Sequence, residues 1–311
     1  MTTTKTKRYV REDGRLLDTL REQTSVLNTI TRSTSSCEWH SDETKVVCSI
    51  QGPRELQFSS LSQSKEDGER LVVESYCKLL PSKNDDEDDG SSFDDIFRRK
   101  NDDEDDGSSF DDPLKEEKEK ERTTEQFVKS CAKAAIELEK NASFGLVVSV
   151  QELKNDGSFL SCALNAVGLA LILSGVETKG WMCSSTACLM EMSDGKGEGE
   201  TPTFALALDP TREEEMKAKA TMTCAFLINE ETEDKTILLG TKMRGKMTET
   251  EVFERVALCR DAATSVCTYF DRVLTLRERE FEERYRITDE KVEKWKTMME
   301  SIAEETKTKA V

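Results

Sequence analysis

Short stretches of apolar and β-branched residues, each ended by a turn signal, predict β-strands along most of the chain. Thr44–Ile50 is the clearest of them, and Gly52-Pro53 follows it as a break. The polar stretch Glu38–Lys45 suits a hairpin loop, which would put His40 in an exposed turn. Further strands are expected within residues 24–58 and at Arg70–Leu80, Phe144–Val150, Ala187–Met192, Thr203–Leu208, Ala220–Ile228 and Lys235–Leu239.

Capping motifs and apolar spacing predict three helices. Thr123-Thr124-Glu125-Gln126 matches a capping box at the start of the first, with apolar residues on one face after it. Residues 160–174 are almost wholly apolar and small-sided, so this helix is expected inside the core, with Gly175 as its C-cap. Thr248–Glu251 is a second capping box. The inward residues of the helix after it are predicted to be Val252, Val256, Cys259, Ala263, Val266 and Phe270.

The order of these elements indicates the fold class. Strands followed by helices that pack on one side occur twice along the chain, which is typical of a layered α+β domain. With 311 residues, the chain is long enough to bury a substantial core.

A duplicated acidic segment interrupts this pattern. The sequence K-N-D-D-E-D-D-G-S-S-F-D-D occurs at Lys83–Asp95 and again at Lys100–Asp112. Each copy has one large apolar residue, which is too little buried surface to offset the entropy of ordering it, so residues 83–121 are predicted to be a disordered insert. Its serines stand three residues before an aspartate, a pattern that acidophilic kinases favour, so a regulatory role is the alternative. The insert holds 18 acidic and 7 basic side chains, so most of the net charge of −18 lies in it rather than on the folded surface.

Composition excludes several kinds of site. The ten cysteines show no C-x-x-C pair and sit among apolar residues, so they are predicted to be small buried residues in a reducing compartment. With a single histidine and no thiolate pattern, neither a metal nor a cofactor site is expected. No run approaches the 18 apolar residues of a membrane span, and the N-terminal M-T-T-T-K-T-K-R lacks the apolar core of a signal peptide.

Six short motifs stand in a fixed order along the chain. They are R-E-D-G-R at Arg11–Arg15, L-R at Leu20-Arg21, T-K-V-V-C-S-I-Q-G-P at Thr44–Pro53, D-G-S at Asp156–Ser158, A-L-N-A-V-G-L-A-L at Ala163–Leu171 and L-D-P-T-R-E-E at Leu208–Glu214. Their order and spacing resemble the RNase PH-like proteins. Within that superfamily they resemble the ring subunits of the eukaryotic RNA exosome, in the branch with R-x-D-G-R near the N-terminus.

The resemblance implies two β-α-β-α halves with mixed sheets and helices packed between them. The RNase PH-like domain would comprise residues 1–82 and 122–272, with the insert at 83–121 and a charged helical extension at 273–311. Such subunits pair with a sister chain, and three pairs form a six-membered ring that RNA threads, with RNA-binding cap subunits and associated nucleases. The expected location is the nucleus, including the nucleolus, and the cytoplasm.

Active members of the family use phosphate to cleave the last phosphodiester of an RNA. Their phosphate turn carries an arginine after a glycine and a small hydroxyl residue, but here Gly157 and Ser158 are followed by Phe159. They also have two carboxylates about six residues apart. Here the first would be Glu213 or Glu214, and Lys219 or Ala220 occupies the second position. We therefore expect a non-catalytic ring subunit that supports 3′-to-5′ RNA processing. The alternatives are a phosphate-dependent 3′-to-5′ exoribonuclease with a rearranged pocket, or a protein that acts outside the ring through its insert and C-terminal helix.

Two features of the sequence leave their roles open. Arg11, Arg15 and Arg21 match the N-terminal family motif and are expected either to brace the N-terminal segment and a subunit contact or to touch RNA. From residue 271 the chain is predicted to be a charged helix. Its apolar stripe would either dock on a partner or pack on its own domain, and it consists of Val292, Trp295, Met299 and Ile302.

Overall fold

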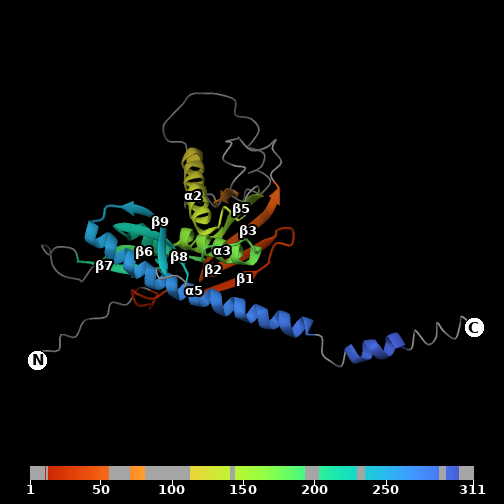
Figure 1. Ribbon diagram of the computed structural model, residues 1–311. Helices are drawn as coiled ribbons and strands as arrows, with labels where there is room; N and C mark the ends of the chain where they lie inside the picture. Colours follow the sequence, from red (N-terminus) through yellow and green to blue (C-terminus); the bar gives the residue numbers. More distant parts are fainter. Residues whose placement is uncertain are drawn as a thin grey trace, which may run out of the picture. The chain divides into compact units, whose positions relative to one another are not determined.

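The computed structural model describes residues 11, 13–55, 71–80, 113–140, 144–192, 203–229, 235–286 and 292–300 (Figure 1). The chain divides into two compact units, Met1–Cys267 and Thr268–Val311. The predicted domain boundary at residues 272 and 273 lies five residues beyond this division, and both fall inside helix α5. Both copies of the duplicated segment, within residues 81–112, lie outside the described residues, as does Ile302.

The first unit contains two β-sheets. The five-stranded sheet has the order β1-β2-β3-β5-β4 and the four-stranded sheet has the order β7-β6-β8-β9. All neighbours pair antiparallel except β4 and β5, which are parallel. The strands are β1 Gln23–Leu27, β2 Ser35–Ser41, β3 Thr44–Glu55, β4 Val72–Lys78, β5 Phe144–Lys154, β6 Trp181–Met192, β7 Thr203–Leu208, β8 Ala220–Ile228 and β9 Thr236–Gly245.

Helix α3, Phe159–Ser174, lies between the two sheets and contacts β2 and β3 on one side and β6 and β8 on the other (Figure 1). It carries no charged side chain, and its residues from Ser161 to Leu171 are buried. Gly175 ends it in the left-handed conformation, with φ 74°, as predicted. The α+β class and the helix between two sheets are therefore confirmed, but only the five-stranded sheet is mixed, because the four-stranded sheet is antiparallel throughout.

The first hairpin differs from its prediction. Strands β2 and β3 pair from Ser41↔Thr44 outward, so the connection is Asp42-Glu43 and not the polar stretch Glu38–Lys45. His40 lies within β2, where its ring nitrogen is 2.8 Å from the Glu38 carboxylate. The prediction was wrong because a strand with one solvent-facing side tolerates polar residues at every second position, as the burial alternation of β2 shows.

Strand β3 also continues past its predicted break. Its pairing with β5 resumes at Arg54↔Gly145 after a register shift between Gln51 and Arg54. A bulge of this kind leaves residues out of the hydrogen-bonded ladder, so Pro53, which has no N–H to donate, is accommodated without ending the strand.

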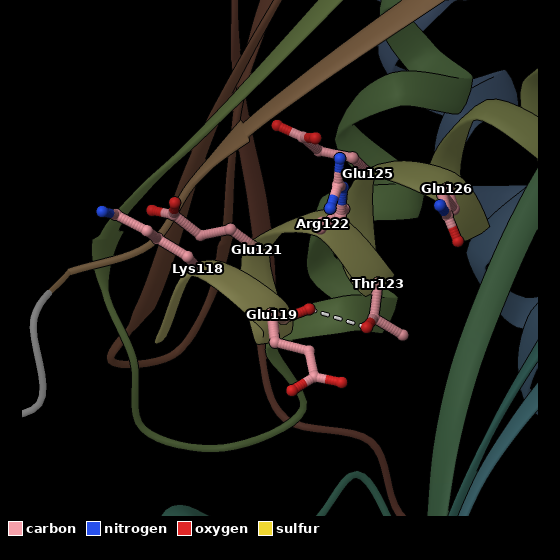
Figure 2. Close-up of a pocket in the computed structure, with 7 residues that line it drawn as sticks. All are labelled: Lys118, Glu119, Glu121, Arg122, Thr123, Glu125 and Gln126. Carbon is pink, nitrogen blue, oxygen red and sulfur yellow. Dashed lines mark hydrogen bonds between the residues drawn. The ribbon is translucent and has the colours of Figure 1, made fainter. Parts of the chain in front are cut away.

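Helix α2 spans Pro113–Ala135 and begins ten residues before the predicted capping box. Figure 2 shows this part of the helix, where the hydroxyl of Thr123 donates to the carbonyl oxygen of Glu119 at 2.7 Å. Thr124 bonds Lys120 in the same way at 2.8 Å. Both threonines therefore lie inside the helix and not at its cap. The Glu- and Lys-rich residues before them have high helix propensity, so the predicted insert is helical from residue 113.

The carboxylates of α2 protect an edge of the five-stranded sheet. Strand β4 is the last in its sheet, so part of its backbone has no strand partner. Glu125 Oε1 accepts the backbone N–H of Cys77 at 2.9 Å, and Glu121 Oε1, one helical turn earlier, accepts that of Leu79 at 3.1 Å. Glu152 accepts the next N–H, from Leu80, at 2.9 Å.

Removing one of these carboxylates should weaken the contact between α2 and β4. The substitution E125A leaves the Cys77 N–H without its acceptor in a partly buried position, so we expect a loss of about 1–2 kcal/mol in the free energy of unfolding. E119A, on an exposed part of the same helix, is the matched control. Urea denaturation of both variants checks this, and an equal midpoint for the two would contradict it.

Helix α5 spans Glu249–Tyr285, and its predicted capping box is confirmed. Thr248 N–H donates to Glu251 Oε2 at 2.6 Å, and Glu251 N–H donates back to Thr248 Oγ1 at 3.4 Å. Cys259 and Ala263 are fully buried as predicted, whereas Val252 and Val256 are half-buried. Ser185 of β6 donates to the Cys259 carbonyl at 2.9 Å, which holds the first part of α5 against the four-stranded sheet.

In the second unit, residues 292–300 are also helical, and the side chains of Val292, Trp295 and Met299 there are exposed. The docking role of this stripe stays a prediction.

Candidate functional site: the turn before α3

The D-G-S motif forms the turn between β5 and α3. Gly157 has φ 89° and Ser158, the N-cap of α3, has φ 52°, so both lie in the left-handed region. A Cβ atom on Gly157 would be 2.5 Å from the carbonyl oxygen of Pro210. The Ser158 hydroxyl donates to that same oxygen at 3.0 Å. This turn is therefore packed directly against the turn that carries Asp209 and Pro210.

A carboxylate of the chain itself binds at the start of α3. The backbone N–H of Ser158 donates to Glu215 Oε1 at 2.8 Å. Helix N-termini attract anions because their N–H groups are unpaired and the helix dipole is positive there. Glu215 thus occupies the position where an external anion would bind, and the next residue is the half-buried Phe159.

Burial raises the pKa of Glu215, although the Ser158 N–H and the charge of Arg21 oppose this effect. Glu215 was missed by the sequence reasoning, which considered Glu213 and Glu214. In a run of three glutamates nothing in the sequence alone shows which one turns toward α3, so only the L-D-P-T-R-E-E motif as a whole marked this region.

Neutralising Glu215 should change how stability depends on pH. A carboxyl group whose pKa is higher in the folded than in the unfolded chain contributes its full stability below the unfolded pKa, about 4.3 for glutamate, and loses it as the pH rises through the folded pKa. The amide of E215Q can still accept the Ser158 N–H. We therefore expect E215Q to be at least as stable as the parent at pH 7, with the difference vanishing near pH 4.

Urea denaturation between pH 4 and pH 7 checks this expectation. E213Q, an exposed neighbour on the same helix, is the control. A parent chain that gains stability over E215Q as the pH rises would contradict it.

Arg21 connects the two turns through a buried ion pair. Its guanidinium is 2.8 Å from Asp209 Oδ1 and donates to the carbonyl oxygens of Asp156 at 2.8 Å and Gly157 at 3.1 Å. The backbone N–H of Arg21 also donates to Asp209 Oδ2, at 3.0 Å. Burial disfavours the ionised carboxylate, but the bonds and charge of Arg21 outweigh it and hold the pKa of Asp209 below its ordinary value. Asp209 is thus fully engaged within the chain.

The other two motif arginines also bind the chain itself. Arg11 donates to the carbonyl oxygens of Leu17, at 3.0 Å, and of Leu208, and its guanidinium lies 3.5 Å from Glu214. Arg15 donates to the Asp209 carbonyl oxygen at 3.2 Å and pairs with Asp13 at 2.5 Å. These are the contacts of a brace between the N-terminal segment and the Asp209 turn. A contact of Arg11, Arg15 or Arg21 with RNA or a neighbouring subunit stays a prediction.

The four residues at the candidate carboxylate positions differ in burial and in the groups that they contact. Glu214 is buried and forms a capping box with Thr211 at the start of α4, Arg212–Lys217, whereas Glu213 is exposed. Lys219 lies 4.4 Å above the Phe204 ring, and Ala220 is buried at the start of β8.

A cavity of about 240 Å³ opens beside the two turns. Its lining residues are Asp13, Asp156, Met190, Thr211, Glu213, Glu214 and Lys217. Four carboxyl groups and a single lysine make this lining unfavourable for phosphate, because like charges repel.

The described residues provide neither a metal site nor a reactive thiol. Within the part of the chain that the structure describes, no group of three or more His, Cys, Asp or Glu side chains could hold a metal ion. All ten cysteines are buried and free, as predicted, and burial raises the pKa of Cys37 and Cys131 to about 12. None of the described helices is long and apolar enough to cross a membrane.

A family model described as "3′ exoribonuclease family, domain 1" matches residues 19–177, slightly more than half of the chain. The exosome complex component Rrp41 of Archaeoglobus fulgidus is 25% identical over 258 residues, which is 83% of each chain. The Arabidopsis thaliana protein named exosome complex exonuclease RRP46 homolog is 25% identical over 210 residues, 68% of this chain and 67% of that one.

Solved structures share the fold. Rrp46 of rice (Oryza sativa) superposes with a TM-score of 0.63 at 20% identity, over 85% of this chain and all of that one. A chain of an archaeal exosome core gives a TM-score of 0.57 at 17% identity, over 84% and 91% of the two chains. A chain of the Archaeoglobus fulgidus exosome with RNA bound to the active site gives 0.56 at 17% identity, over 84% and 92%.

Proposed function

The chain belongs to the 3′ exoribonuclease family, and on that premise we propose that it is a ring subunit of an RNA exosome that does not itself cleave RNA. Its partners would be other RNase PH-like chains, one of them in a direct heterodimer, together with RNA-binding cap subunits and associated nucleases. RNA would pass through the assembled channel. The names of the relatives, all exosome proteins, support this assembly.

The observation that carries the non-catalytic assignment is the bond between Glu215 and the N-terminus of α3. Phosphorolysis needs phosphate held by cationic and backbone donors beside the scissile bond. Here the Ser158 N–H is bonded to Glu215 at 2.8 Å, and the Arg21 guanidinium forms an ion pair with Asp209. A phosphate ion would have to displace a carboxylate and then face the acidic cavity beside it.

The assembly is tested by the native mass and composition of the complex purified on this protein from its own cells. A species of several chains that includes other RNase PH-like subunits is expected. A lone chain or a homo-oligomer would overturn the ring assignment. The proposal also implies a location in the nucleus, including the nucleolus, and the cytoplasm, which imaging of a tagged chain would test.

The non-catalytic assignment has its own test. The purified chain is incubated with RNA and inorganic phosphate, with an archaeal exosome as positive control, and no release of nucleoside diphosphates is expected. Phosphate-dependent release by the pure chain would favour the alternative, an exoribonuclease with a rearranged pocket.

A further inference from the structure

Strand β9 is the longest edge strand of the two sheets. It has ten residues and pairs with β8 on one side, and no other described strand pairs with it on the other. In an antiparallel strand every second residue directs its N–H and C=O away from its neighbour, so such an edge offers a row of backbone donors and acceptors. At the edge strand β4, by contrast, Glu125 accepts the N–H of Cys77, and Glu121 accepts that of Leu79 just after the strand.

The side chains of β9 are unusually apolar for an exposed strand. Ile237, Leu238 and Met243 are exposed by 48%, 44% and 53%. Helix α2 lies against part of one face, where Lys242 donates to Thr124 at 3.3 Å. An exposed apolar strand with a free edge is a template for pairing with another chain.

The charges of this strand select the kind of chain that fits. Residues 235–246 contain no acidic residue, in a protein with a net charge of −18. Lys235, Arg244 and Lys246 are exposed, at the two ends of the strand. A second copy of β9 would bring these positive charges against themselves, so a homodimer through this edge is disfavoured.

We propose that β9 is a docking edge for an extended segment of another protein chain that alternates apolar and acidic residues. The segment adds a fifth strand to the four-stranded sheet. Main-chain hydrogen bonds provide affinity. Leu238 and Met243, which lie on one face of the sheet opposite Phe226 and Met222, contact its apolar side chains. Its acidic side chains, on the other face, pair with the flanking basic residues. RNA is the poorer fit, because residues 235–246 include no aromatic side chain on which bases would stack.

Hydrogen exchange of the complex purified on the full chain from its own cells, compared with the chain alone, tests strand addition directly. We expect alternate backbone amides of residues 236–245 to exchange at least about tenfold more slowly in the complex. A photoreactive residue at position 237 should cross-link to an acidic protein segment. Unchanged exchange in β9, or cross-links to RNA only, would overturn the proposal.

Charge reversal provides a matched pair of variants. K235E, R244E and K246E together should lower the yield of the cross-linked partner about tenfold. K118E, K133E and R279E together change the net charge equally at exposed positions elsewhere and should leave the yield unchanged. Equal losses in the two triple variants would show that net charge alone matters, against the proposal.

This inference and the ring assignment fail in different ways. If the complex lacks RNase PH-like chains but β9 is still protected from exchange, the docking proposal holds and the ring assignment is wrong. If the complex contains those chains but β9 exchanges freely, the ring assignment holds and the docking proposal is wrong.

Discussion

Replacing Asp209 with alanine should cost about 3–5 kcal/mol of the free energy of unfolding, because Arg21 would remain buried without its counter-ion. Domains of ordinary size are stable by only about 5–15 kcal/mol, so this loss should be evident as a large shift of the urea midpoint. The same change removes acceptors for the Arg21 backbone N–H and for the Ser41 hydroxyl. Arg21 also donates to the carbonyl oxygens of Asp156 and Gly157, so the loss of its counter-ion should weaken the contact between the N-terminal segment and the D-G-S turn.

Two comparisons show whether the ion pair is the cause. The double variant R21M/D209A should be less destabilised than the sum of its single variants, because removing both partners leaves no unpaired charge. The exposed pair Lys154–Glu43 is the control, and E43Q should leave the midpoint unchanged. If the loss of unfolding free energy in the double variant equals the sum of the two single losses, the ion pair is not the cause.

The pH dependence of Asp209 has the opposite sign to that of Glu215. Its folded pKa is lowered, so its contribution is present above the unfolded pKa, about 3.9 for aspartate, and is lost as the pH falls through the folded value. The parent chain should therefore lose its advantage over D209A in acid.

The second large effect is expected from G157A. An added Cβ would lie 2.5 Å from the Pro210 carbonyl oxygen and 2.6 Å from the Arg212 backbone nitrogen, and these are backbone atoms that cannot rotate away. The left-handed φ of 89° adds further strain for any residue with a Cβ. Together these effects should cost about 3 kcal/mol or more and separate the two turns.

G175A is a well-matched control. Gly175 is also left-handed, with φ 74°, but a Cβ there would meet nothing within 4 Å. Its cost should be only the conformational part, about 1–2 kcal/mol. Urea denaturation of the two variants separates crowding from backbone strain, and equal losses would contradict the close packing of the turns.

Much of the fold was predictable from the sequence because its elements have strong local signals. Strands β7 and β8 begin and end at the predicted residues, and α3 differs from its prediction by one residue at the start. Each of these elements is a continuous run of mostly apolar residues, so its first and last residues are easy to predict. Helix α2 was predicted, but its start was placed ten residues too late, because a threonine pair that matches a capping box can also lie inside a helix when its hydroxyls bond the preceding turn.

The site was less predictable because its contacts join distant residues. The motifs led to the expectation that Phe159 replaces an arginine and that Lys219 or Ala220 replaces a carboxylate, and this stays a prediction. The carboxylate of Glu215, by contrast, reaches a backbone N–H 57 residues away. Arg255 was also missed. Its side chain is fully buried in α5 and donates to the Glu251 carbonyl oxygen at 3.0 Å, although the charge of an arginine argues for an exposed position.

The position of α3 also bears on how the chain unfolds. Each sheet buries part of its inner surface on this one uncharged helix, so neither sheet can separate without exposing residues such as Leu164 and Leu169 to water. The two halves of residues 1–267 should therefore unfold in a single cooperative transition and not in two, one for each half. Limited proteolysis should then yield no stable fragment that corresponds to one half of the domain.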